Sequence, residues 1–345
     1  MKLSVLDQST VVTGRAADAS IRESLALARH AEALGYHRYW VAEHHNSASI
    51  AGSAPEILIA AIAATTRRIR VGSAGVMLPH YSALKVAEQF RVLEAIAPGR
   101  IDLGLGRAPG SDGLTAHALN PNAAVAANHF PAQVRDLLAW LAGDKLAEGH
   151  PFRDVVAMPT GAGVPEVWML GSSDYGAQVA AHFGLPYCFA HFITDGQGAA
   201  EAMALYRAEY RPSARHPEPW GAICVWALAA DTPAEAERLF SSRALWRLGR
   251  DRGVYAALPS PEEAALYPYS EAERARIERL QRSAIIGTAA DVAARLRGLA
   301  ESLGVQEMAV LTATHDPVPR RRSYELLGAK FNLTAEGRGP KLAAG

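Results

Sequence analysis

Short apolar runs alternate with longer helical patterns along this chain of 345 residues, and that alternation is what most constrains its fold. Each run except the last is followed by a helix-like stretch, directly or after a loop. Strands that are apolar throughout are typical of a parallel sheet buried on both faces. The expected strands are Leu3–Leu6, Arg38–Ala42, Ile69–Ser73, Ile101–Leu105, Val167–Leu170, Tyr187–Ala190, Ala222–Ala229 and Glu307–Leu311.

These strand and helix units favour an α/β fold, namely a (β/α)8 TIM barrel with insertions. An open doubly wound sheet is the rival. A typical barrel needs about 250 residues, so this chain must carry insertions. We predict them near 108–128, 144–165 and 250–271, where Gly, Pro and polar residues break the helical period. We expect a single barrel domain over 1–333 and a flexible tail over 334–345, which has no periodicity.

Capping residues mark several helix ends. Glycine after the periodic pattern predicts that two of these helices end at Gly35 and near Gly304. The expected helix starts are Ser20-x-x-Glu23, Thr232-Pro233-x-Glu235 and Thr288-x-x-Asp291.

The composition excludes several function classes. Lys and Arg number 35 against 35 for Asp and Glu, which argues against nucleic acid, because its binding rests on a basic surface. The longest apolar run, Ile57 to Ala64, is too short to span a membrane, and no secretory signal opens the chain. Cys188 and Cys224 form no Cys-x-x-Cys pair, which fits a reducing cytoplasm and excludes a cysteine zinc site. We therefore expect a cytoplasmic protein without a metal.

Three familiar motifs fail on inspection. Gly104-x-Gly106 follows a strand, but Pro109 stands at the third glycine position of the dinucleotide fingerprint. The neighbouring residues His44 and His45 would point to opposite faces of a strand, so they cannot share a metal ion without a bend. Gly171-Ser172-Ser173 lacks the second glycine of a serine nucleophile elbow.

Polar groups do gather where expected strands two to five end, and barrel active sites form at those carboxyl ends. Each segment has an ordinary structural explanation when it is considered alone. A histidine pair is most often a loop element, an arginine can pair with a surface carboxylate, and Gly-Ser-Ser is a common helix cap. Their convergence in a barrel favours a functional site instead. The four segments are Glu43-His44-His45, Ser73-Ala74-Gly75, Gly106-Arg107 and Gly171-Ser172-Ser173.

Six stretches of sequence resemble the bacterial luciferase-like flavin monooxygenase family, in its single-chain oxidoreductase branch of unassigned substrate. The resemblance extends from Leu3 to about Leu333, and the segment from Gly99 to Asp112 is specific to it. The stretches are 38–46 (RYWVAEHHN), 71–79 (VGSAGVMLP), 87–90 (AEQF), 98–112 (PGRIDLGLGRAPGSD) and 170–173 (LGSS) with 184–186 (GLP).

The resemblance implies an FMN-dependent monooxygenase that receives reduced flavin from a separate reductase and uses O2. It makes His44 the catalytic histidine and Ala74-Gly75 a non-proline cis peptide under the flavin ring, where Gly75 leaves room for the ring. The chain departs from luciferase at Gly106, where a reactive cysteine is missing, and at Gly171, where an acidic residue is missing, and this speaks against light emission. The implied cofactor site is Ala74, Gly75, Arg107, Gly171, Ser172, Tyr175 and Gly176.

Phosphate recognition follows independently from the residues, because Arg107 supplies a charged planar fork and a helix opening after Ser172 supplies unpaired N–H groups. The substrate pocket is expected between 108–128, His191-Phe192 and 250–269, where Tyr255, Tyr267 and Tyr269 suggest a small apolar substrate.

Two other functions stay open at this point. They are a deazaflavin-dependent dehydrogenase on the same fold and a non-enzymatic flavin-binding protein. The expected second helix, over 56–65, is apolar almost all round, which favours a homodimer that packs helices two and three.

Overall fold

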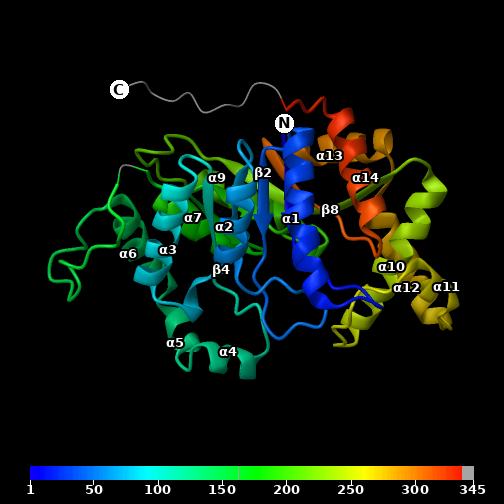
Figure 1. The fold of residues 1–345 in the computed structure, drawn as a ribbon, viewed down its shortest axis with the longest axis horizontal. Coiled ribbons are helices and arrows are strands. Elements are labelled where there is room, and N and C mark those ends of the chain that lie inside the picture. The colour runs from blue at the N-terminus through cyan, green and yellow to red at the C-terminus, as the bar shows by residue number, and fades with distance from the viewer. Residues whose placement is uncertain (162, 336–345) are drawn as a thin grey trace.

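The computed structural model describes residues 1–161 and 163–335, and in it parallel strands close into a barrel wrapped by helices (Figure 1). The strand order is β10-β1-β2-β3-β5-β6-β7-β8, and β10 pairs with β8 to close the ring. The predicted TIM barrel is confirmed, and the open sheet is excluded because no strand of this ring is left as an edge. The ring consists of β1 (Lys2–Asp7), β2 (Arg38–Val41), β3 (Arg70–Ser73), β5 (Ile101–Gly106), β6 (Glu166–Gly171), β7 (Tyr187–Phe189), β8 (Gly221–Ala230) and β10 (Glu307–Leu311).

Two further strands were not expected. β4 (Val76–Met77) pairs with the end of β5, and β9 (Ile285–Thr288) extends β8 beyond the ring by pairing with Ala227–Ala230. Both strands are short, so their sequences cannot be distinguished from those of a loop or the start of a helix.

Helices cover the outside of the barrel, one after each strand of the ring. They are α1 (Ala17–Leu34), α2 (Pro55–Thr65), α3 (Ala83–Ile96), α6 (Phe130–Ala142), α7 (Asp174–Phe183), α9 (Ala199–Ala208), α13 (Ala289–Leu303) and α14 (Pro317–Lys330).

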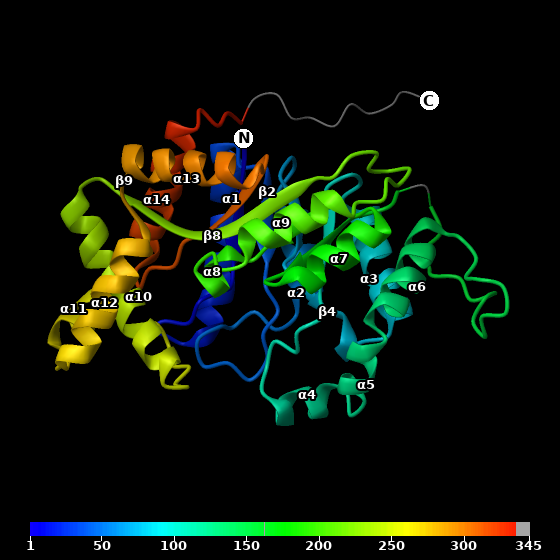
Figure 2. The ribbon, with the colours of Figure 1, turned by 180° about the vertical axis from the view of Figure 1, so that it is seen from behind.

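Additional helices interrupt this scheme in two main places. One group follows β5, and the other lies between β8 and α13. In Figure 2 both groups reach below the barrel, at the end opposite the N-terminus. The first group is α4 (Gly113–Leu119) and α5 (Ala123–Asn128), and the second is α10 (Pro233–Asp251), α11 (Pro261–Leu266) and α12 (Glu271–Ser283). The short η1 (Leu78–His80) and α8 (His191–Thr194) complete the set.

The predicted tail is only partly covered, because residues 336–345 lie outside the described part of the chain. The domain bounds and the 144–165 insertion stay predictions.

Most of the predicted helix ends are confirmed. Thr232 caps α10 by accepting a hydrogen bond from Glu235 N, and Thr288 forms a capping box with Asp291. Gly35 and Gly304 end α1 and α13 in the left-handed conformation, with φ of 85° and 61°.

The predicted cap at Ser20 is wrong, because α1 already begins at Ala17. The Ser20 hydroxyl donates instead to Thr10 O (2.8 Å), and Glu23 forms an ion pair with Arg15. Both contacts tie the first helix to loops at the barrel's carboxyl end.

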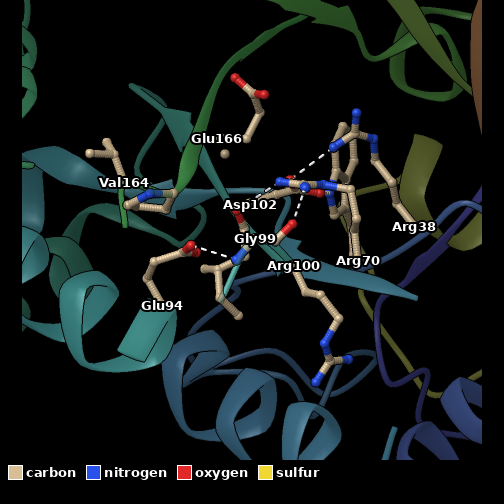
Figure 3. Close-up of polar contacts among 12 residues, drawn as sticks. Arg38, Arg70, Glu94, Gly99, Arg100, Asp102, Val164 and Glu166 are labelled. Carbon is tan, nitrogen blue, oxygen red and sulfur yellow. Dashed lines mark hydrogen bonds and ion pairs between the residues drawn. The ribbon is translucent and has the colours of Figure 1, made fainter. Parts of the chain in front are cut away.

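Charged side chains close the amino end of the barrel, as Figure 3 shows. Arg38 Nη1 lies 2.8 Å from Asp102 Oδ1, and Arg38 Nε lies 2.8 Å from Glu307 Oε1. Arg70 approaches the same Asp102 oxygen at 2.6 Å. Burial alone would raise the pKa of Asp102, but the two guanidinium groups lower it. These charges are buried together and neutralise one another, so this end has a structural role.

In the part of the chain that the structure describes, no helix is long and apolar enough to cross a membrane. Nor do three or more metal-ligating side chains gather there.

Candidate active site

A cavity of about 400 Å³ opens at the carboxyl ends of the strands. Strands β1, β2, β5, β6, β7, β8 and β10, the segment after β3, and helices α7, α8 and α10 contribute to its walls. The structure brings together every residue that sequence reasoning placed in the site. Those residues, all of which line the cavity, are His44, Ala74, Gly75, Arg107, Gly171, Ser172, Tyr175 and Gly176.

One end of the cavity combines a cation with a helix N-terminus. Arg107 follows β5 directly, and its guanidinium carbon lies 3.8 Å from the centroid of the Tyr175 ring. Tyr175 is in the first turn of α7, whose N-cap residue, Ser173, makes no side-chain capping bond. Among the described residues, no carboxylate pairs with Arg107. This end therefore offers an unneutralised fork and free N–H groups to an anion.

Two glycines bring the start of α7 to the cavity. A Cβ atom added at Gly171 would lie 3.3 Å from the Gly176 Cα, and one added at Gly176 would lie 3.2 Å from the Gly171 Cα. Both are tighter than ordinary contacts, so side chains here would push α7 away from β6. Gly171 stands where the luciferase family has an acidic residue. Glycine at this position allows α7 to pack closely against β6.

The Ala74-Gly75 peptide is cis, as the resemblance implied. A Cβ at Gly75 would lie 2.7 Å from both Gly104 O and Leu170 Cδ1. That Gly75 leaves room for a flavin ring stays a prediction, and the structure adds a second reason for glycine at this position. Glycine is required there because the neighbouring strands β5 and β6 approach too closely for a side chain.

His44 is a half-buried histidine whose ring has no hydrogen-bond partner among the described residues. Its Nδ1 is completely buried and unsatisfied, while its backbone N donates to Gly52 O at 2.9 Å. Burial lowers the pKa of His44 to about 4, with a smaller contribution in the same direction from Arg250. The imidazole is therefore neutral near pH 7, and one ring nitrogen can accept a proton.

The neighbouring His45 is held by the buried carboxylate of Glu43. His45 Nε2 lies 2.9 Å from Glu43 Oε1, and the same oxygen accepts a hydrogen bond from Tyr81 Oη at 2.7 Å. Met77 N donates to Glu43 Oε2 at 3.1 Å. These bonds fix the loop after β2, as expected for Glu43 and His45, and they leave only His44 free to meet a ligand.

The expected substrate walls are partly confirmed. Ala108, Phe192 and Tyr255 line the cavity, whereas His191 lines a smaller neighbouring cavity. Tyr267 and Tyr269 line neither cavity and lie against each other, with ring centroids 4.8 Å apart. Both belong to the connection between α11 and α12.

Sequence reasoning missed most of the contribution of α10. Arg250 begins the expected wall over 250–269, but this helix also places Arg243 and Trp246 in the cavity wall. The helical spacing of these residues already indicated a shared face, but nothing in the sequence shows that this face turns toward the barrel.

The fold and the position of the cavity are those typical of TIM-barrel enzymes, whose active sites form at the carboxyl ends of the strands. Residues 1–307 match the luciferase-like monooxygenase family. The chain belongs to this family and is an enzyme of it.

Two relatives span almost the whole chain. A protein of Escherichia coli (strain K12) named "Luciferase-like monooxygenase" is 40% identical, with 94% of this chain and 95% of that protein covered. The "N-acetyl-S-alkylcysteine monooxygenase" of Bacillus subtilis (strain 168) is 36% identical, with 95% and 97% covered.

Among solved structures, apo-MsnO8 superposes with a TM-score of 0.88 at 39% identity, covering 96% of this chain and 99% of that one. At 18% and 13% identity, only the fold is shared with a Baeyer-Villiger monooxygenase solved with FMN and with an F420-dependent secondary alcohol dehydrogenase, each with a TM-score of 0.67.

Proposed function

We propose that this protein is an FMN-dependent monooxygenase that uses reduced flavin and O2 to oxygenate a small, largely apolar organic substrate. One observation carries the proposal: a cavity with an unpaired Arg107 beside the start of α7 also holds the neutral, unpartnered His44. Arg107 and the start of α7 suit a phosphate, and His44 suits proton transfer.

The residues present fit FMN. Arg107 would hold the phosphate through its charged fork, together with the Ser172 hydroxyl and the N–H groups of Tyr175 and Gly176. The Ala74-Gly75 peptide would support the flavin ring. When bound and reduced, FMN supplies the electrons that allow one oxygen atom of O2 to enter the substrate while the other leaves as water.

The chain's own contribution is proton handling and exclusion of water. His44 can take up or release a proton at a ring nitrogen, because its imidazole is neutral and unpartnered. Apolar side chains such as Leu6, Phe192 and Leu311 line the same cavity. They keep bulk water away from the reacting atoms, which limits unproductive consumption of reduced flavin.

A cofactor titration tests the proposal. Arg107→Ala should weaken FMN binding about ten- to a hundredfold, because a charge-assisted contact is lost, while riboflavin binding, which involves no phosphate, stays unchanged. Arg279→Ala, an exposed arginine of α12 away from the cavity, is the control. Equal weakening of FMN and riboflavin would contradict the phosphate role.

Two measurements separate the alternatives. The absorbance spectrum of a cofactor retained on purification distinguishes FMN from a deazaflavin, and a deazaflavin would indicate hydride transfer without O2. Incorporation of label from isotopic O2 into a product establishes oxygenation. Tight flavin binding without turnover of any substrate would instead indicate a binding protein.

The proposed enzyme needs a supplier of reduced flavin, and we propose a separate reductase for this role. We also propose a cytoplasmic location, consistent with the free, buried Cys188 and Cys224. Exposed apolar residues support a homodimer through α2 and α3, namely Ile57, Val92 and Ile96.

A further inference from the structure

Three arginines of α10 lie on one face of the helix at positions 243, 247 and 250. Arg247 is neutralised by Asp195, whose two carboxylate oxygens lie 3.2 and 2.8 Å from its Nη atoms. Arg243 and Arg250 line the active-site cavity. Neither of these two has a carboxylate partner among the described residues.

Aromatic rings, not carboxylates, surround the two cavity arginines. The guanidinium carbon of Arg243 lies 4.3 Å from the centroid of the Trp226 ring. The corresponding distances from Arg250 are 5.0 Å to Trp246 and 5.7 Å to Tyr255. Stacking of this kind orients a guanidinium but leaves its N–H donors unsatisfied.

The carboxylates nearest to these arginines are already engaged. Asp195 is paired with Arg247, and Asp251 is paired with Arg276 at 2.8 Å. Burial lowers the pKa of both Arg243 and Arg250, and the positive charge of Arg247 lowers it further. Besides Arg107, the cavity wall thus holds two further cations that no carboxylate of the described residues neutralises.

Two buried arginines show the contrast with Arg243 and Arg250, which are half-buried in the cavity wall. Arg38 is paired with Asp102 and Glu307, and Arg320 is paired with Asp7 at 2.7 Å. Buried charges are normally paired, because desolvation is otherwise uncompensated. Two unpaired guanidinium groups in an active-site wall therefore indicate that a ligand provides the missing negative charge.

We propose that Arg243 and Arg250 form an anion subsite, distinct from the phosphate end at Arg107, which binds a carboxylate group of the substrate. The substrate class is then an organic acid with an apolar body. This inference rests on the proposed function and narrows its substrate. Two guanidinium forks match the planar geometry of a carboxylate.

The position of the subsite fits catalysis. Arg250 lies close enough to His44 to lower its pKa, and both line the same cavity. An acid held by the arginines would place its apolar part along Phe192, Ile193 and Trp246, which line the cavity too. The subsite would thus fix which part of the substrate reaches His44.

Matched acid and amide probes test the subsite. Octanoate and octanamide, hexanoate and hexanamide, and phenylacetate and phenylacetamide each share one body and differ in head-group charge. Their binding is measured by calorimetry on the full chain, with and without saturating FMN. We expect at least one acid to bind about ten- to a hundredfold more tightly than its amide.

Variants assign that preference to the two arginines. Arg243→Leu and Arg250→Leu should each reduce it, the double variant should abolish it, and Arg250→Lys should keep part of it. Arg279→Leu, on the exposed face of α12, is the matched control and should change nothing. Thermal unfolding midpoints establish that the variants are folded.

Three results would overturn the inference. They are equal binding of acid and amide in all three pairs, a preference that survives the double variant, and weakened FMN binding with unchanged riboflavin binding in the double variant. The last would mean that these arginines hold the flavin phosphate. Failure of the wild-type protein to bind FMN would instead refute the proposed function. The anion subsite would still be tested, because the probes are also measured without flavin.

Discussion

Neighbouring side chains in this protein have very different surroundings. His45 is tied to the buried Glu43, whereas His44 turns into the cavity and has no partner for its ring. Both histidines lie in the loop that follows β2 (Arg38–Val41), where the Glu43 carboxylate holds His45 and His44 lines the cavity. Of the two, only His44 is placed for the proton-transfer role that we propose.

Removing that imidazole should uncouple flavin oxidation from product formation. His44→Ala should leave FMN affinity within a few-fold, because Arg107 and α7 stay intact. Product formed per reduced flavin consumed should fall by about 10²–10⁴, with hydrogen peroxide released instead. His45→Gln is the control that perturbs only the loop. An unchanged ratio in His44→Ala would return His44 to a structural role.

The burial of His44 also predicts a pH dependence of stability. Its pKa is about 4 in the folded protein and about 6.5 when unfolded, so the unfolded state binds more protons between these values. The free energy of unfolding should therefore fall as pH decreases from 6.5 to 4, and this residue should contribute about 2 kcal/mol of that loss by pH 5.

Urea unfolding at pH 7.5 and pH 5 measures the effect. His44→Gln cannot titrate there and should lose correspondingly less stability than the wild type. Burial lowers the pKa of His191 as well, and its contribution cancels in this comparison. Equal losses in both proteins would show that His44 is not held neutral by burial.

At the scale of elements, the close approach of β3 and β5 explains a glycine that the sequence left without a role. Gly104 belongs to the rejected dinucleotide motif. A Cβ there would lie 2.2 Å from Ser73 O, a backbone atom of the neighbouring strand. Glycine is thus required at position 104 for β3 and β5 to pack side by side in the barrel.

A pair of glycine variants tests this account. Gly104→Ala should destabilise the protein by about 1–3 kcal/mol, because the strands must separate. Gly298→Ala should stabilise it by about 0.5–1 kcal/mol, because Gly298 lies within α13 with open space around its Cα. Denaturant unfolding of both variants measures these differences. Destabilisation of both by a similar amount would contradict the argument.

At the scale of the whole molecule, the two ends of the barrel differ in whether their arginines are paired with carboxylates. At the amino end Arg38, Arg70, Asp102 and Glu307 neutralise one another. At the carboxyl end Arg107, Arg243 and Arg250 have no carboxylate partners among the described residues. These charges at the amino end are thus neutralised, whereas the cavity at the carboxyl end has unpaired cations that suit an anion.

The outer surface gives a prediction about assembly. Ile57 of α2 is 68% exposed, and Val92 and Ile96 of α3 are 46% and 53% exposed. We expect a dimer through this face at micromolar concentration, and Ile57→Glu should shift it toward monomer, because a buried charge at an interface costs free energy. Leu266→Glu, at an 85% exposed position of α11, should leave the dimer intact. Sedimentation of a monomeric wild type would refute this.

The sequence by itself determined the barrel, most helix ends and the residues that converge in the cavity. Strand pattern and helix caps are local properties, and closure of a parallel sheet brings its carboxyl ends together whatever fills the loops. Tertiary structure alone decided the orientation of α10 and the environment of each polar group. Whether Arg247 or Arg250 is neutralised depends on Asp195 and Asp251, and no local pattern encodes which carboxylate meets which arginine in space.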